Sequence, residues 1–371
     1  MEKIKILFVV SDLRRCGPTN QLFGIVSNLE RNEFDFKIIT LNKEPKDTEI
    51  ELFLNNGINV TCINENKKNI FLQIRRLKRE INLYQANIIH SSGIRANIIA
   101  NFVKRKTKQI VTLRNNAYQE YPMQMNKIKS YIAIRLTELI IKRADYCVCC
   151  SYCLKNAYND HGFKDVLAIQ NGVDINKYNI HNYKQEEIFR KFLNLDFNKK
   201  VFIISGLLNS RKNILIIIKS FLYSIRKNDS YLILLGDGEL KEEAMKLSNH
   251  CENILFEGNV NNVPEYLNIA DYYISASKAE GLPNSVLEAG CMGLQLILSD
   301  IPEHKEIESG LDHSSIKYFN YNNVIELTDI LTNCTSKMQL SQKIYNSNDF
   351  IENYSSAKMS KEYAFLYRKV I

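Results

Sequence analysis

The sequence predicts an α/β protein built from two doubly wound domains, each with a parallel sheet covered by helices on both faces. Short apolar runs of strand length alternate with helix-length stretches along most of the chain. The alternation stops at one polar stretch, residues 176–200, and then starts again. The length of 371 residues also exceeds what a single hydrophobic core usually serves.

The first series of strands begins at the N-terminus. The apolar run 4–10 is followed by the turn-like Cys16-Gly17-Pro18, and a helical pattern of apolar residues then runs from Leu22 to Leu29. This order of strand, glycine loop and helix predicts the first βα unit of a parallel sheet. Further strands are expected at 36–40, 59–63, 87–90, 109–113 and 146–150.

The second series begins after the turn at residues 171–174. Its strands are expected at 201–205, 231–235, 253–256, 272–275 and 294–299. We therefore predict an N-terminal domain over 1–175 and a C-terminal domain over 176–353, with ligands at the carboxyl ends of the strands. The tail, 354–371, is expected to form an amphipathic helix, with one apolar face made by Met359, Tyr363, Leu366 and Tyr367.

Composition excludes several classes of protein. Hydrophobic residues make up 45% and charged residues 24% of the chain, which is typical of a globular protein. No apolar run reaches the roughly 20 residues of a membrane-spanning helix, and residues 1–10 resemble a strand without a cleavage site, so we expect a cytoplasmic protein.

The nine cysteines are expected to be free thiols, because disulfide-bonded proteins usually have an even number of cysteines at regular spacings. Cys147, Cys149, Cys150 and Cys153, with His161 nearby, lack the paired spacing of zinc knuckles. We interpret these cysteines as small buried residues and expect no metal site.

Positive charge is concentrated in the first half of the chain. Residues 1–180 hold 28 Lys and Arg against 17 Asp and Glu, whereas the remainder holds 21 against 24. Basic runs lie at 74–81, with apolar residues at helical spacing, and at 103–108. Two interpretations stay open: an ordinary solvated surface, or a basic face that binds anionic lipid on the inner side of the cell membrane or a phosphorylated acceptor.

The segment 280–289, Glu-Gly-Leu-Pro-Asn-Ser-Val-Leu-Glu-Ala, is the most informative part of the chain. Pro283 is suited to the first turn of a helix, which places Glu280 in the preceding loop and Glu288 inside the helix. The amides of residues 284–286, Asn284, Ser285 and Val286, are then expected to be free at a helix N-terminus, where a diphosphate binds well.

The two carboxylates of this segment suit sugar binding. Each can accept hydrogen bonds from two adjacent hydroxyls, so we expect Glu280 to contact a sugar and Glu288 the ribose of a nucleotide. The alternative is that both are solvated residues at a helix end. Likewise Arg211 and Lys212, expected to open the helix after strand 201–205, either face the same diphosphate or form a solvated basic pair.

With these motifs, the whole chain resembles the retaining glycosyltransferases of family 4, which have the GT-B architecture of two Rossmann-like domains facing a central cleft. The matching segments are Gly17, Asn171-Gly172-Val173-Asp174, Ser205-Gly206, Arg211-Lys212-Asn213, Leu235-Gly236-Asp237-Gly238, the pair Glu280 and Glu288, Ser299-Asp300 and the C-terminal helix, which in this family crosses back to the first domain.

The resemblance implies a role for each matching position. Lys212, Glu280 and Arg211 would be the catalytic residues, with Lys212 on the donor phosphates. Donor-binding residues would be Gly17, Gly206, Val260, Asn284, Ser285, Val286 and Glu288, with Gly17 allowing close backbone approach and Val260 near the base. The C-terminal domain would hold the donor and the N-terminal domain, with the tail helix, the acceptor.

Two positions depart from the family pattern. Ser92 stands where the usual active-site histidine is found, two residues after His90, and Leu207 replaces a common arginine after the strand glycine. His90 is interpreted as a packed residue at a strand end rather than a base. Arg95 and Arg114, with His90 and Ser92, are candidates for the acceptor side, where arginines suit a diphosphate; surface ion pairs are the alternative.

The resulting hypothesis is a hexose transfer from a nucleoside-diphosphate sugar to a glycan or a polyprenyl-diphosphate-linked acceptor in surface polysaccharide biosynthesis. The resemblance implies retention of the anomeric configuration; the absence of an Asp-x-Asp motif favours a reaction without metal or other cofactor. No nucleic-acid partner is expected. The departures keep two alternatives open, a non-catalytic GT-B scaffold that binds glycan and a nucleotide-sugar epimerase. The sequence does not determine whether the donor is a UDP, GDP or ADP sugar.

Overall fold

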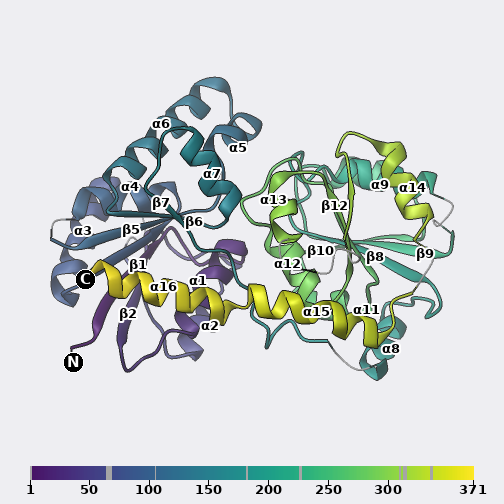
Figure 1. The fold of residues 1–371 in the computed structure, drawn as a ribbon, viewed down its shortest axis with the longest axis horizontal. Coiled ribbons are helices and arrows are strands. Elements are labelled where there is room, and N and C mark those ends of the chain that lie inside the picture. The colour runs from purple at the N-terminus through teal and green to yellow at the C-terminus, as the bar shows by residue number, and fades with distance from the viewer. Residues whose placement is uncertain are drawn as a thin grey trace. The chain divides into compact units, whose positions relative to one another are not determined.

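The computed structural model describes residues 2–63, 69–104, 106–180, 183–224, 228–308, 311, 316–334 and 337–371. The chain forms two compact units, one made of residues 1–172 with 356–371 and the other of residues 173–355 (Figure 1). The domain boundaries expected from the sequence lie within three residues of the borders of these units.

The first unit contains a parallel sheet of seven strands in the order β3-β2-β1-β4-β5-β6-β7. Helices cover both of its faces. The strands are β1 (Ile4–Val10), β2 (Phe34–Thr40), β3 (Asn59–Cys62), β4 (Ile88–Ser92), β5 (Lys108–Leu113), β6 (Tyr146–Cys149) and β7 (Val166–Ala168).

Two apolar clusters hold the helices of this unit against its sheet. One joins α1, α2 and the tail helix α16 to β1 and β2, and the other joins α3 and α4 to the opposite face of β1, β2 and β4. The helices are α1 (Gly17–Ser27), α2 (Ile50–Asn55), α3 (Ile70–Tyr84), α4 (Ile94–Val103), α5 (Ala117–Gln124), α6 (Lys127–Arg143), α7 (Tyr152–Asp160) and α16 (Ser356–Val370).

The second unit contains a parallel sheet of six strands in the order β10-β9-β8-β11-β12-β13. Its strands are β8 (Lys200–Ser205), β9 (Ser230–Leu235), β10 (Ile254–Gly258), β11 (Tyr272–Ser275), β12 (Gln295–Ser299) and β13 (Ile316–Phe319). Its helices are α8 (Tyr183–Phe192), α9 (Ile214–Tyr223), α10 (Lys241–Leu247), α11 (Val263–Ile269), α12 (Asn284–Cys291), α13 (Pro302–Lys305), α14 (Val324–Thr332) and α15 (Leu340–Tyr354), with a 3₁₀ turn at Glu306–Glu308.

The predicted fold class of two doubly wound domains is confirmed. Every strand expected from the sequence is present, with its ends within two residues of the predicted ones. The short strands β7 and β13 were not predicted. Within the described ranges, no helix combines the length and apolar character that a bilayer-spanning helix needs.

The tail helix α16 belongs to the first unit although the second unit precedes it in the chain. The four apolar residues predicted to form one face of this helix, Met359, Tyr363, Leu366 and Tyr367, are all buried in the cluster that contains α1. Ser360 Oγ also donates to the carbonyl of Ile25 at 2.8 Å, which fixes the helix against α1. The amphipathic tail helix is therefore confirmed.

Candidate functional site

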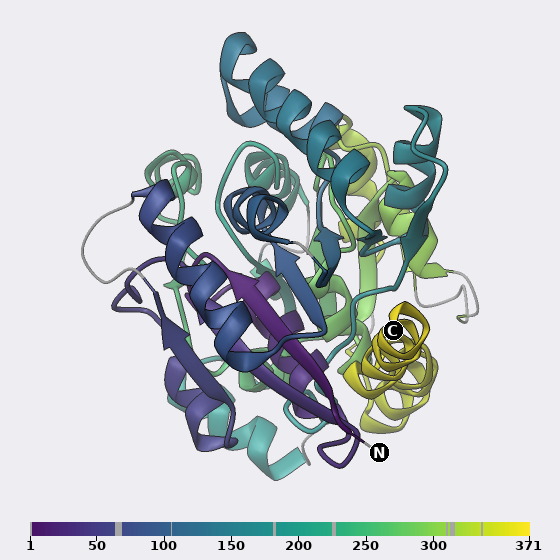
Figure 2. The ribbon, with the colours of Figure 1, turned by 90° about the vertical axis from the view of Figure 1, so that its left-hand side faces the viewer.

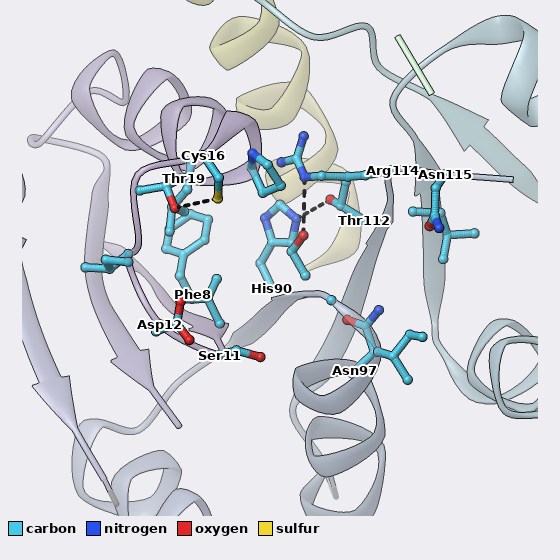
Figure 3. Close-up of a pocket in the computed structure, with 18 of the residues that line it drawn as sticks. Phe8, Ser11, Asp12, Cys16, Thr19, His90, Asn97, Thr112, Arg114 and Asn115 are labelled. Carbon is cyan, nitrogen blue, oxygen red and sulfur yellow. Dashed lines mark hydrogen bonds between the residues drawn. The ribbon is translucent and has the colours of Figure 1, made fainter. Parts of the chain in front are cut away.

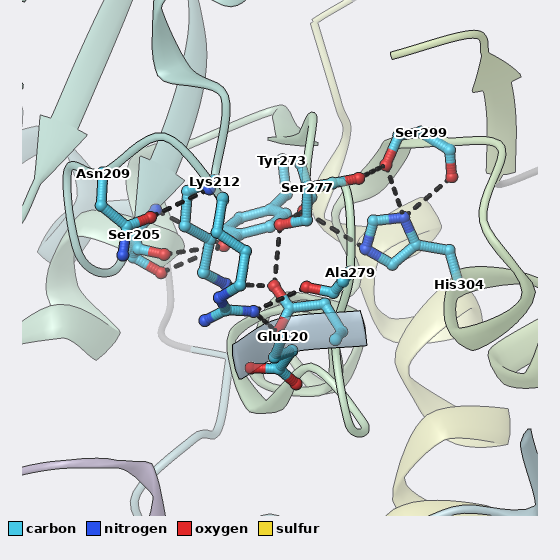
Figure 4. Close-up of polar contacts among 12 residues, drawn as sticks. Glu120, Ser205, Asn209, Lys212, Tyr273, Ser277, Ala279, Ser299 and His304 are labelled. Atoms are coloured by element: carbon cyan, nitrogen blue, oxygen red, sulfur yellow. Dashed lines mark hydrogen bonds and ion pairs between the residues drawn. The ribbon is translucent and has the colours of Figure 1, made fainter. Parts of the chain in front are cut away.

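A charged cluster lies beyond the carboxyl ends of β8 and β11 in the second unit (Figure 4). Lys212 Nζ lies 2.6 Å from Glu280 Oε1, and Arg211 Nη1 lies 2.7 Å from Glu280 Oε2. Arg211 Nη1 also donates to the carbonyl of Ala279 at 2.6 Å. The structure thus brings together the three residues that the resemblance assigned to catalysis.

The prediction that Arg211 and Lys212 open a helix is wrong in detail. α9 begins at Ile214, and Asn213 before it has a left-handed backbone with φ 54°. Asparagine tolerates this conformation, which ends the turn and sets the direction of the helix. Both cations consequently lie in the loop, where their side chains reach Glu280 instead of following the helix axis.

Glycines at the ends of β8 and β9 make room for this loop. A Cβ on Gly236 would lie 1.9 Å from the carbonyl oxygen of Gly206, so the two turns pack backbone against backbone. Gly206 itself has φ 131°, and a Cβ there would contact Lys212 Cε at 3.6 Å. Gly206, predicted to bind the donor, therefore shapes the space beside Lys212.

Glu280 is an ionised carboxylate in a buried position. Burial by itself would raise its pKa, but the charges of Lys212 and Arg211 outweigh that effect and hold the pKa well below its ordinary value. With two cations around one carboxylate, the cluster carries an excess positive charge. Such a cluster can bind a further anion at the exposed edges of the two basic side chains, which are each 16% exposed.

A series of hydrogen bonds connects Glu280 to Ser277, Ser275 and His304 (Figure 4). Ser277 Oγ donates to Glu280 Oε1 at 2.7 Å and lies 3.3 Å from Ser275 Oγ. His304 Nδ1 lies 2.8 Å from the carbonyl of Ser299, which only accepts, so Nδ1 carries the proton. His304 Nε2 therefore accepts from Ser275 Oγ at 3.3 Å.

His304 remains neutral, because complete burial lowers its pKa to about 4. Sequence reasoning missed the supporting residues Ser275, Ser277 and His304. The only signal available was the Ser-x-Ser spacing just before Glu280 and a histidine soon after Ser299-Asp300. Neither pattern is specific, since the contact depends on how β11 and β12 lie side by side.

Glu288 lies in α12 of the same unit and differs from Glu280 in its electrostatics. Burial raises the pKa of Glu288 to about 7, against the opposing effects of the Lys177 charge and a hydrogen bond with Tyr178. Neither Lys177 nor Tyr178 was identified from the sequence. They follow Asn171-Gly172-Val173-Asp174, and only the fold brings them to α12.

The predicted helix N-terminus needs two corrections. Pro283 is the residue before the helix, with extended backbone at ψ 99°, and α12 begins at Asn284. The amide of Val286 is not free, because it donates to the carbonyl of Pro283 at 3.0 Å. A tight turn at the cap closes this bond, so the prediction of a diphosphate seat now concerns only Asn284 and Ser285.

Val260 lies between β10 and α11 and is half-buried. Its expected position near a nucleobase stays a prediction.

A pocket of about 470 Å³ lies in the first unit at the carboxyl ends of β1, β4 and β5 (Figure 3). Cys16 and Pro18, which flank Gly17 at the start of α1, lie in its wall. Among the predicted acceptor-side residues, His90, Ser92 and Arg114 line it. Polar lining residues that the sequence did not single out are Ser11, Asp12, Arg14, Thr19, Asn42, Asn97, Thr112, Asn115, Tyr121 and Thr137.

His90 is a packed residue of β4, as interpreted from the sequence. Its Nδ1 lies 2.7 Å from the Tyr367 hydroxyl and its Nε2 lies 2.7 Å from Thr112 Oγ1. Burial, with a smaller effect of the Arg114 charge, lowers its pKa to about 3. A neutral imidazole held between two hydroxyls is a structural element of the pocket wall.

The two predicted acceptor-side arginines have different surroundings. Arg114 Nε donates to Ser92 Oγ at 3.3 Å and Nη1 donates to Asn171 Oδ1 at 3.1 Å, at the edge of the pocket. Arg95 donates to Gln73 Oε1 from Nε at 3.1 Å and from Nη2 at 2.8 Å. The structure therefore places Arg114 on the pocket and directs Arg95 toward α3.

The cysteine cluster and the basic helix were both weighed from the sequence. Cys147 and Cys149 are buried, and burial raises the pKa of Cys147 to about 12. The described part of the chain holds no group of three His, Cys, Asp or Glu side chains suited to a metal ion. In α3, Leu77 and Ile81 face the core, so the expected apolar face of run 74–81 is not available to a membrane. The run 103–108 lies partly outside the described residues, at Arg105.

Comparison with known proteins supports one family over most of the chain. The family described as "Glycosyltransferase Family 4" matches residues 17–177, and "Glycosyl transferases group 1" matches residues 198–333. Among relatives, the O-antigen biosynthesis glycosyltransferase WclY of Escherichia coli is 27% identical over 99% of both chains. The UDP-Gal:alpha-D-GlcNAc-diphosphoundecaprenol alpha-1,3-galactosyltransferase of Escherichia coli is 26% identical over 74% of this chain and 73% of its own.

A solved structure confirms the fold. Anabaena Alr3699/HepE, crystallised in complex with UDP and glucose, superposes with a TM-score of 0.80 at 16% identity, over 99% of this chain and 100% of that one. Two parallel sheets with interleaved helices, both family matches and the relatives along the full length agree. The chain therefore belongs to the group 1 glycosyltransferases and has the GT-B fold.

Proposed function

We propose that this glycosyltransferase moves a hexose from a nucleoside-diphosphate sugar to a lipid-linked glycan acceptor during surface polysaccharide biosynthesis, with retained anomeric configuration. The cluster of Glu280 with Lys212 and Arg211 carries the proposal, because it joins a carboxylate suited to sugar hydroxyls to two cations suited to a diphosphate. Glu288, on the neighbouring helix, is proposed to bind the ribose of the donor.

The proposed chemistry follows from charge. When the bond between the sugar and the donor diphosphate breaks, negative charge grows on the departing diphosphate. Lys212 and Arg211, already held in place by Glu280, would stabilise that charge without reorganising. Because two fixed cations supply this stabilisation, we propose that the reaction needs no metal ion.

The relatives support the substrate class. The galactosyltransferase at 26% identity is named for UDP-Gal and for a diphosphoundecaprenol acceptor, and WclY is named for O-antigen biosynthesis. We therefore propose a UDP-sugar as donor and a polyprenyl-diphosphate-linked glycan as acceptor. The pocket with Ser92 and Arg114 is proposed to take the acceptor, and the site of action is proposed to be the cytoplasmic face of the cell membrane.

The first experiment measures thermal stabilisation by UDP, GDP, ADP and their sugars, since a ligand that binds only the folded state raises the Tm. The wild type is compared with Lys212→Ala and Glu288→Ala, and with Lys191→Ala as a control, whose side chain is 75% exposed. We expect UDP and UDP-sugars to stabilise the wild type and the control, and both site variants to lose most of the response.

A second experiment tests transfer itself. The protein is incubated with UDP-hexoses and a lipid-linked acceptor, with EDTA in a parallel sample, and the anomeric configuration of the product is assigned by NMR. A retained product in both samples supports the proposal, and an inverted product would contradict it. Release of an altered free sugar without acceptor would instead favour an epimerase. Failure of every nucleotide to stabilise the protein would favour the non-catalytic scaffold, which the departures at Ser92 and Leu207 motivate.

A further inference from the structure

Large apolar side chains are exposed along one side of α6. Ile128 is 74% exposed, Tyr131 60%, Ile132 52% and Leu139 43%. At 100° per residue these positions and Arg135 fall within an arc of about 100° of the helix surface. We call these five residues the α6 surface.

The inward side of the same helix is made mainly of smaller or polar residues. Ser130, Ala133 and Thr137 are buried, with Ile140 and Ile141 near the C-terminal end, and Thr137 Oγ1 donates to the carbonyl of Ala133 at 2.9 Å within the helix. Small inward residues let the helix lie close to its neighbours, whereas three bulky aliphatic residues and a tyrosine point to solvent. An arrangement of this kind leaves apolar area to be covered by something outside the unit.

Basic residues surround the α6 surface. Lys127, Lys129, Lys142 and Arg143 belong to the same helix, in addition to Arg135. The one acidic residue of α6, Glu138, is 18% exposed and is neutralised by Arg135 at 2.7 Å. The helix therefore presents a net positive charge together with its apolar side chains.

The position of α6 in the first unit leaves this surface accessible. α5 and α6 form a hairpin that stands at the top of the unit in both Figure 1 and Figure 2. Met123 and Met125, at the turn of the hairpin, are 44% and 37% exposed and extend the apolar area beyond the helix.

We propose that the α6 surface binds an anionic lipid bilayer, with α6 lying in the plane of the interface. Apolar side chains would enter the headgroup region while the long basic side chains reach the lipid phosphates. A protein partner explains the apolar residues but gives no reason for five basic residues against one acid. α3 is also basic, but its exposed apolar residues, Ile70, Phe71 and Leu83, lie at its two ends, whereas Leu77 and Ile81 in between face the core.

The inference rests on the proposed function, because an acceptor held by a polyprenyl chain lies in a membrane. Binding to this surface would keep the first unit beside its acceptor and raise the local concentration of the enzyme. The charge component is expected to weaken with salt, whereas the apolar component is not.

The test is flotation of the whole protein with vesicles of phosphatidylglycerol and phosphatidylethanolamine, against vesicles of phosphatidylcholine alone. Two variants of α6 probe the proposal: Ile128→Ser with Ile132→Ser changes the α6 surface, and Lys127→Gln with Lys129→Gln changes the basic residues around it. The matched control, Arg75→Gln with Arg79→Gln, removes the same charge from α3. Circular dichroism and gel filtration establish the fold and the oligomeric state of each variant.

We expect the wild type to bind the anionic vesicles and each α6 variant to bind at least tenfold more weakly. In the lysine variant, each lost basic residue lowers the affinity about fivefold. In the isoleucine variant, two apolar side chains no longer enter the headgroup region. The α3 control should show a decrease in the logarithm of its vesicle affinity that is less than half the decrease shown by the lysine variant of α6. No binding by the wild type, or equal losses in the α6 and α3 variants, would overturn the proposal. A dimer that dissociates in the isoleucine variant would assign the surface to a second copy and would also overturn it.

Failure of the membrane proposal is distinguishable from failure of the proposed function. Flotation uses no substrate, and stabilisation by UDP uses no membrane. Both α6 variants should keep the full thermal response to UDP, because none of the changed residues belongs to the charged cluster or lines the pocket.

Discussion

The pocket of the first unit and the charged cluster of the second unit both lie at the carboxyl ends of strands, but they differ in the space and the charged groups that they contain. In the first unit, His90 is neutral between two hydroxyls, and a pocket of about 470 Å³ stays open in front of it. In the second unit, Lys212, Arg211 and Glu280 are in direct contact, and the hollow beside Lys212 measures about 10 Å³. The first region offers open space and hydrogen-bonding groups, with Arg114 at its edge, and the second offers charged groups fixed in direct contact.

This difference suits the two proposed substrates. A glycan acceptor is an uncharged, bulky group near its reacting hydroxyl, and it needs room and hydrogen-bonding partners. A departing diphosphate needs cations that are already oriented. Changing each region separately therefore tests whether space and charge are divided between the units as proposed.

The largest effect is expected from the charged region. Lys212→Ala should lower kcat by about 10²–10³-fold, because it removes one preorganised cation from the leaving diphosphate. Lys212→Arg keeps the charge and should recover part of the rate. The measurement is the rate of sugar transfer at saturating donor, and a loss below threefold in the alanine variant would contradict a role for Lys212 in the reaction.

Opposite responses to pH are the next largest effect. His90 has a folded pKa of about 3 against 6.5 for the free group, so the unfolded state binds more protons below pH 6.5. The first unit should lose about 2 kcal/mol of stability as pH falls from 6.5 to 5. His90→Gln should remove most of this loss.

For Glu288, the expected dependence of stability on pH has the opposite sign. Its folded pKa is about 7 against 4.5, so the folded state binds more protons and ionisation above pH 4.5 costs stability. The second unit should lose about 2 kcal/mol between pH 5 and 8, and Glu288→Gln should remove that loss. Hydrogen exchange measured peptide by peptide separates the two units; equal pH trends in both would break the comparison.

A smaller effect is expected in the pocket. Arg114→Ala should raise the acceptor KM by about tenfold with little change in kcat, the loss of one charge-assisted hydrogen bond. Arg95→Ala is the matched control, because Arg95 is held by Gln73, away from the pocket lining. Equal effects of the two variants on KM would remove the distinction between these arginines.

The smallest expected effect concerns the support of Glu280. Ser277→Ala removes the hydroxyl that donates to Glu280 Oε1 at 2.7 Å, and it should lower kcat about fivefold, corresponding to about 1 kcal/mol. Its pH profile should change little, since Lys212 and Arg211 still hold the pKa of Glu280 low. His304→Asn should act in the same direction through Ser275; a rise in activity for either variant would contradict the positioning role.

Part of the site was predictable from the sequence. Glu280 and Glu288 flank a proline-led helix start, and Arg211 and Lys212 follow a strand, so their residue types and spacing indicate a donor site. Val286 and Arg95 show where this approach ends. Whether an amide is free, or an arginine turns toward Gln73 or a pocket, depends on contacts that spacing does not encode.

The sequence by itself determined the two doubly wound domains, all strands except β7 and β13, and the apolar face of the tail helix, because the spacing of apolar residues along the chain indicates which side of an element is buried. Only the tertiary structure decided that Ser277 and His304 support Glu280, that Tyr367 of the tail contacts His90, and that Ile128 and Ile132 of α6 are exposed. Each of these depends on residues distant in sequence that meet only when sheets and helices pack, and a side chain's pKa and exposure are properties of that packing.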